Sequence, residues 1–131
     1  MLGVDTNVLV RFLVRDHEIQ FQKARKLIKR EVAAGRRVFV NQLVLLETVW
    51  VLRSRYGIPK NQIIDTLSGL LDSTDVCLED EAAVEETLFL WRDTNTDFAD
   101  CLIAAKNRRL GCQATATFDV KAAKLHGFIS V

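Results

Sequence analysis

Short apolar runs that alternate with longer segments of helical periodicity are the feature that most restricts how this chain folds. The runs are as long as buried strands, and the segments between them repeat apolar residues every three or four positions, as one face of a helix does. Two parallel strands need a long crossover between them, which is usually a helix. We therefore expect an α/β fold, a three-layer α/β/α sandwich with a central, mostly parallel sheet. The expected strands are Leu2–Asp5, Arg37–Val40, Asp75–Leu78, Ala114–Thr117 and Phe128–Val131.

The helical segments fill most of the remaining chain, with one proline and six glycines to interrupt them. After a first helix through Val8 and Leu13, they are expected at His17–Ala34, Gln42–Tyr56, Lys60–Leu71, Glu81–Arg92, Phe98–Leu110 and Val120–Leu125. The helix over Gln42–Tyr56 is apolar almost all round, which is typical of a helix buried in a core or a subunit interface. No linker or repeat divides the sequence, so we expect one domain over residues 1–131.

Composition excludes several classes of protein. No stretch reaches the roughly 18 apolar residues that suggest a membrane span. The chain begins without the basic region of a signal peptide, and Asp5 interrupts its first apolar run. The three cysteines are scattered and have no metal-ligand spacing, as expected of a cytoplasmic protein without disulfides.

Charge is divided unevenly along the chain. Residues 1–60 hold 12 Lys and Arg against 5 Asp and Glu, and residues 61–131 hold 6 against 12. Solvated faces of opposite sign explain this division. That is the default interpretation, and the functional alternative is a basic surface that receives an anionic polymer beside an acidic site.

Four acidic residues occupy places where a parallel sheet presents ligands, near the carboxyl ends of its strands. Asp5 ends the first expected strand, and Asp119 follows the fourth. Asp100 lies in the first turn of a helix. Glu47 lies inside an almost wholly apolar helix, where a buried carboxylate needs a partner or loses its charge.

Each acid also has a purely structural explanation. Asp5, Asp100 and Asp119, together with Asp97, suit the starts of helices, where a carboxylate accepts hydrogen bonds from free backbone N–H groups. For Glu47 a functional role is favoured, and an ion pair with a lysine or arginine, such as Arg53 or Arg11, is the structural alternative.

Several carboxylates at one sheet edge repel one another unless a cation lies between them. Mg²⁺ or Mn²⁺ is the expected ion, because these hard cations take oxygen ligands and bridge to phosphate. No Cys or His accompanies the acids, which argues against zinc. Such an ion activates water and stabilises charge on a phosphate, so we expect phosphodiester hydrolysis.

Four motifs in this order resemble the PIN-domain ribonucleases, and the length resembles the VapC-type toxins of toxin–antitoxin modules. The motifs are Asp5-Thr6-Asn7-Val8-Leu9, the isolated Glu47, the segment from Asp97 to Ala104, and Thr117-Phe118-Asp119. The resemblance covers essentially the whole chain. One departure is the helix start Asn41-Gln42, where many members have a small hydroxyl residue.

The resemblance implies a metal-dependent endoribonuclease whose catalytic residues are Asp5, Glu47, Asp100 and Asp119. Asp5 and Asp100 are the most direct ligands of Mg²⁺ or Mn²⁺, and the accessory residues are Asp97, Asn7 and Thr117. The substrate is an RNA, such as tRNA, mRNA or rRNA. A homodimer and a small cognate antitoxin are the implied protein partners. Candidates for contact with RNA phosphates are Arg11, Arg15, Arg36, Arg37, Arg53 and Arg55.

Two other functions are compatible with parts of the sequence. An aspartyl-phosphate phosphatase would use Asp5 as its nucleophile, but Asn7 stands where haloacid-dehalogenase-like enzymes carry their second acid. A non-catalytic module that binds proteins through the apolar Gln42–Tyr56 helix is the other alternative. Loss of the acid set is expected in such a module, whereas this chain retains all four residues.

Overall fold

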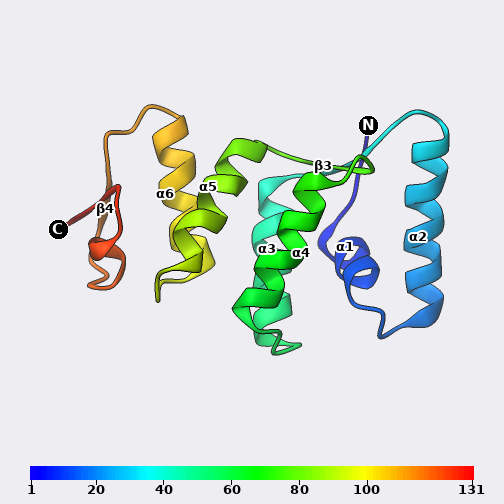
Figure 1. Cartoon of the computed structure of the whole chain (residues 1–131), viewed down its shortest axis with the longest axis horizontal. Helices are drawn as coiled ribbons and strands as arrows, with labels where there is room; N and C mark the ends of the chain where they lie inside the picture. Colours follow the sequence, from blue (N-terminus) through cyan, green and yellow to red (C-terminus); the bar gives the residue numbers. More distant parts are fainter. The chain divides into compact units, whose positions relative to one another are not determined.

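The computed structural model describes residues 1–131, which form two compact units, Met1–Glu79 and Asp80–Val131. We call them the N-terminal unit and the C-terminal unit. Figure 1 follows both along the chain. The single domain expected over residues 1–131 stays a prediction.

All strands pair in parallel, as the alternation of strands and helices predicts. In the N-terminal unit the sheet has the order β1 (Leu2–Gly3), β2 (Val38–Val40) and β3 (Val76–Leu78). In the C-terminal unit β4 (Thr115–Thr117) pairs with β5 (Phe128–Ser130). The α/β fold class with a parallel sheet is therefore confirmed.

The helices match the periodic segments closely. The N-terminal unit contains α1 (Thr6–Leu13), α2 (Glu18–Ala33), α3 (Gln42–Ser54) and α4 (Lys60–Asp72). The C-terminal unit contains α5 (Glu81–Arg92), α6 (Phe98–Arg109) and a single 3₁₀ turn, η1 (Ala122–Lys124). The helix predicted at residues 120–125 is this 3₁₀ turn, which is too short to continue as an α-helix. None of the helices combines the length and apolar character that crossing a bilayer requires.

The core of the N-terminal unit covers one face of its sheet. The parallel register places Val38 beside Val76 and Val40 beside Leu78, and all four side chains are at most 2% exposed. The intervening residues are half-buried, as the alternation of side chains along a strand requires. Helix α1 contacts both α2 and α3, and α4 contacts β3 (Figure 1).

Helix α3 is buried on one side only, which corrects the prediction of a helix buried on most sides. Leu45, Val49 and Leu52 are at most 2% exposed, whereas Leu43 and Trp50 are 78% and 60% exposed. Residues spaced by three or four positions share a helix face. The apolar composition therefore builds two faces, one packed in the core and one open.

The C-terminal unit packs α5 against α6. Trp91 of α5 meets Phe98 of α6 edge to face, with ring centroids 5.2 Å apart. Such aromatic pairs add about 0.5–1.5 kcal/mol to the effect of area burial. The side chains of Asn107 on α6 and Thr115 on β4 are joined by a hydrogen bond of 2.9 Å, which ties β4 to this helix pair.

Candidate functional site

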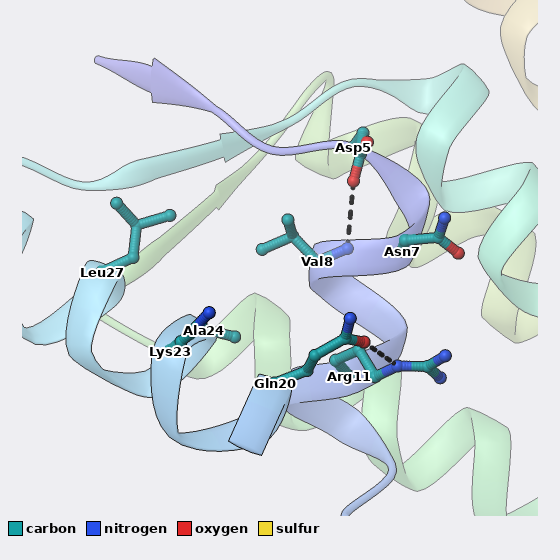
Figure 2. A pocket seen from close by; sticks show the side chains of 8 residues that line it. All are labelled: Asp5, Asn7, Val8, Arg11, Gln20, Lys23, Ala24 and Leu27. Carbon is teal, nitrogen blue, oxygen red and sulfur yellow. Dashed lines mark hydrogen bonds between the residues drawn. The ribbon is translucent and has the colours of Figure 1, made fainter. Parts of the chain in front are cut away.

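Asp5 is the N-cap of α1. Its backbone is extended, and its Oδ1 atom accepts a hydrogen bond of 3.0 Å from the backbone N–H of Val8 (Figure 2). The predicted helix-cap role is therefore present. The cap engages Oδ1 alone, and the exposed side chain keeps its other oxygen for a ligand.

Asn7 is exposed on the first turn of α1 and lines the same pocket as Asp5 (Figure 2). In the structure its side chain donates no hydrogen bond to Asp5. Its predicted role of orienting an acid stays a prediction.

The surroundings of the Glu47 side chain differ from those that the sequence predicted. Its side chain is exposed on α3, on the same face as Leu43 and Trp50. Its Oε1 atom accepts a hydrogen bond from the hydroxyl of Thr6, which is 8% exposed. The sequence predicted a buried carboxylate that needs a partner or loses its charge, whereas the structure shows an exposed carboxylate with a hydroxyl donor.

Arg11, offered as an ion-pair partner of Glu47, has other partners. Its Nε donates to Gln20, and its Nη1 donates to the Tyr56 hydroxyl. Thr6 is the residue that sequence reasoning missed. Its one signal is its place beside Asp5, because nothing in the sequence relates position 6 to position 47.

Helix α3 is capped although it begins with Asn41-Gln42, where a small hydroxyl residue was expected. The Asn41 side chain accepts a hydrogen bond of 2.8 Å from the backbone N–H of Val44. Gln42 is 5% exposed, and its backbone N–H donates to the Glu79 carboxylate at 3.0 Å. The amide side chain of Asn41 therefore caps this helix, a role that Ser and Thr hydroxyls also fill.

Asp97 and Asp100 are the N-cap and third residue of α6, as the helix-start interpretation predicts. The Asp97 side chain accepts no hydrogen bond from the helix, so its carboxylate is not used by the cap. Burial raises the pKa of Asp100, and the negative charges of Asp97 and Asp119 raise it further. Asp97 and Asp119 therefore both lie near enough to Asp100 to disfavour its charged form.

Asp119 is exposed and lies just before the η1 turn, whose N-cap residue is Lys121. Its Oδ1 atom accepts hydrogen bonds from the backbone N–H groups of Lys121 at 2.8 Å and Ala122 at 3.1 Å. The Thr117 hydroxyl accepts a hydrogen bond of 3.0 Å from the Asp119 backbone N–H. Thr117 thus fixes the backbone that carries the acid. As in Asp5, these hydrogen bonds use one carboxylate oxygen.

The predicted residues suit a hard divalent cation in their chemistry. All the donors are carboxylate oxygens, which Mg²⁺ and Mn²⁺ prefer. A cation also relieves the repulsion that Asp97 and Asp119 exert on Asp100. Within neither unit do three or more His, Cys, Asp or Glu side chains gather closely enough to hold a metal ion. The donors therefore fit a hard cation by type, and the charge around Asp100 fits it as well.

Most of the basic residues proposed for RNA contact have structural partners. Arg15 donates two hydrogen bonds to Glu18 and lies 4.4 Å above the Phe21 ring centre. Arg37 donates to the backbone carbonyls of Ser73 and Val76. Of the six candidates, Arg11 alone lines a described pocket together with one of the four acids, Asp5.

Two comparisons with known proteins bear on the family of this chain. The model of the PIN-domain family matches residues 3–127, a range that includes every predicted acid. The chain is also similar to a protein of Aquifex aeolicus (strain VF5) named VapC ribonuclease. The two are 25% identical over 128 residues, which span 98% of this chain and 93% of the relative.

Proposed function

The chain belongs to the PIN-domain family, and from that premise we propose that it is an Mg²⁺- or Mn²⁺-dependent endoribonuclease. The similarity to a protein named VapC ribonuclease supports RNA as the substrate. The structural observation that carries the proposal is Asp100, whose carboxylate is disfavoured as an anion by burial and by Asp97 and Asp119. Such a group gains most from a bound cation.

The proposed catalytic residues are Asp5, Glu47, Asp100 and Asp119. Asp5 and Asp100 hold the metal most directly, and Asp5 does so through the oxygen that its cap leaves open. Glu47 and Asp119 complete the acidic set, with Asp97, Asn7 and Thr117 as accessory residues. The caps and the Thr6 hydroxyl orient carboxylates before substrate arrives, which lowers the reorganisation that catalysis requires.

The metal, when bound, supplies activation of water and neutralisation of phosphate charge. The protein's own contribution is to position the carboxylates and to grip the RNA through basic side chains. Phosphate contacts of this kind give affinity without sequence information.

We further propose that the protein acts in the cytoplasm as the toxin of a toxin–antitoxin pair, with tRNA, mRNA or rRNA as its target. A small antitoxin and a second copy of the chain are the proposed protein partners. The open face of α3, with Leu43 and Trp50 exposed, supports an interface there. A separate expression test checks this role: induction of the protein arrests growth, and the Asp100→Asn variant does not.

Incubation of the purified protein with total RNA, with and without Mn²⁺, tests the nuclease proposal. Cleavage should require the metal and disappear in the Asp100→Asn variant. The Asp65→Asn variant is the matched control, because Asp65 is an exposed acid of α4 outside the proposed set. Equal cleavage by both variants would contradict the assignment. Absence of cleavage by the folded wild-type protein with either metal would favour a non-catalytic binding module.

A further inference from the structure

A pocket between α1 and α2 joins one proposed catalytic acid to basic side chains. Its volume is about 410 Å³. Val8, Ala24 and Leu27 give it an apolar floor, and Asp5 stands at one end (Figure 2). Arg11 and Lys23 supply positive charge to its wall. Pockets of roughly 300–1,000 Å³ with an apolar lining and few polar groups are typical binding sites for small organic groups.

Arg11 is held in place at this pocket by two hydrogen bonds and by an ion pair, in which its Nη1 lies 3.8 Å from Asp16 Oδ1. Its Nε donates to Gln20 Oε1 at 2.6 Å (Figure 2). Its Nη1 donates to the Tyr56 hydroxyl at 3.1 Å. Tyr56 in turn donates to Asp16 at 2.9 Å. A guanidinium carries five N–H groups, so these contacts orient the side chain and leave its Nη2 edge for a ligand.

The positive charge continues along α2. Lys23 and Leu27 also line a second hollow of about 450 Å³, together with Lys26 and Arg30. From Lys23 to Arg30 the helix rises about 10 Å at its rise of ~1.5 Å per residue. Lys23, Lys26 and Arg30 form no ion pair. By contrast, Arg15 is paired with Glu18, and Arg36 is paired with Glu31.

A row of unpaired cations on one helix face repels itself and attracts an anionic chain. The apolar floor beside Arg11 adds a surface for a sugar or a base, which a free phosphate ion does not need. The two features together match a nucleotide. The two hollows share Lys23 and Leu27, so one continuous strand fits along both.

We propose that the face formed by α1 and α2 is the track of the RNA strand on this protein. One nucleotide next to the cleaved bond occupies the pocket, with its phosphate at Arg11 and Lys23 and its sugar or base on Val8, Ala24 and Leu27. The strand then passes over Lys26 and Arg30. This inference rests on the proposed nuclease function and adds the site at which the substrate is held.

Fluorescence anisotropy of a labelled 12-nucleotide oligouridylate tests the track in EDTA, where metal-dependent cleavage does not interfere. Lys23→Gln and Lys26→Gln should each weaken binding several-fold. Each should also reduce the slope of log affinity against log salt concentration by about 0.7, the value for one phosphate contact on a single strand. Lys29→Gln is the matched control, since Lys29 is exposed on α2 but lines neither hollow.

Equal losses in Lys23→Gln and Lys29→Gln would overturn the proposal, because they would show a diffuse attraction to the whole helix. Unchanged binding by Lys23→Gln and Lys26→Gln would also overturn it. Circular dichroism of each variant excludes unfolding as the cause of a loss. Arg11→Lys keeps the charge but loses the fixed planar fork, and it should also weaken binding.

Acylation of lysines, read by mass spectrometry, gives a second measurement on the wild-type protein. Bound oligouridylate should protect Lys23 and Lys26 but not Lys29. Oligonucleotide binding without protection of Lys23 would contradict the proposed RNA path along α1 and α2. A protein segment would then be the expected occupant of the pocket. Absence of metal-dependent cleavage with protection intact would instead contradict the nuclease function alone, so the two failures are distinguishable.

Discussion

The Thr6 hydroxyl donates a hydrogen bond to the Glu47 carboxylate and thereby joins the first turn of α1 to the middle of α3. Thr6 is 8% exposed, whereas Glu47 lies on the open face of its helix. The bond therefore limits the rotamers of an otherwise mobile side chain. Since Thr6 directly follows Asp5, the same turn of α1 positions two of the proposed catalytic acids.

Replacement of Thr6 by Val should slow RNA cleavage roughly 10-fold, as loss of a residue that orients a metal ligand typically does. Val keeps the shape of the side chain but cannot donate to Glu47. More Mn²⁺ should then be needed for half-maximal cleavage. Thr6→Ser restores the hydroxyl and should restore the metal dependence. Equal defects in both variants would show that packing, not the hydrogen bond, explains the loss.

Addition of Mn²⁺ should stabilise the protein, because a cation relieves the repulsion among Asp97, Asp100 and Asp119. Saturation at 100 times the dissociation constant contributes about 2.7 kcal/mol to the free energy of unfolding. Thermal denaturation should therefore show a midpoint that rises with Mn²⁺ and returns on addition of EDTA. The rise should vanish in Asp100→Asn and persist in Asp65→Asn. An equal rise in Asp100→Asn would exclude Asp100 as a ligand.

The fold was predictable from the sequence to a large extent because both kinds of element have a clear period. Helix α5 occupies its predicted residues Glu81–Arg92, and the strands are only one or two residues shorter than expected. Strand ends depend on which neighbour supplies hydrogen bonds, which periodicity does not reveal. The parallel pairing also followed from the helical crossovers.

The surroundings of the acids were less predictable. The cap role of Asp5 was visible because it depends on local sequence alone. The exposure of Glu47 was not, since an apolar helix shows its composition but not which face meets the core. The contact between Thr6 and Glu47 spans 41 positions and follows from packing of α1 on α3.

Leu67→Ala should destabilise the N-terminal unit by about 2–5 kcal/mol, the usual cost of removing a buried leucine and leaving a cavity. Leu67 lies on α4 and is 0% exposed. Leu110→Ala is the matched control, because Leu110 is 73% exposed and its loss should change the free energy by only about 0.5 kcal/mol or less. Chemical denaturation measures both. Similar effects of the two changes would contradict the burial of α4.

The ion pair between Glu31 and Arg36 should make stability depend on pH. Arg36 Nε donates to Glu31 Oε2 at 2.6 Å where α2 ends, and the Glu31 residue is 6% exposed. The hydrogen bond from Arg36 lowers the pKa of Glu31 in the folded chain. A carboxyl whose pKa falls on folding stabilises the fold fully above its ordinary pKa, and this stabilisation is lost as the pH drops through the lowered value.

Glu31→Gln should therefore lower the melting temperature at pH 7, and the difference from wild type should shrink as the solution becomes acidic. Differential scanning calorimetry over a pH series measures this difference. Glu85→Gln, which changes an exposed carboxylate on α5, should show no such trend. If the Glu31→Gln difference stayed constant in acid, the side chain would act through its packing rather than its charge, because protonated Glu and Gln are both neutral.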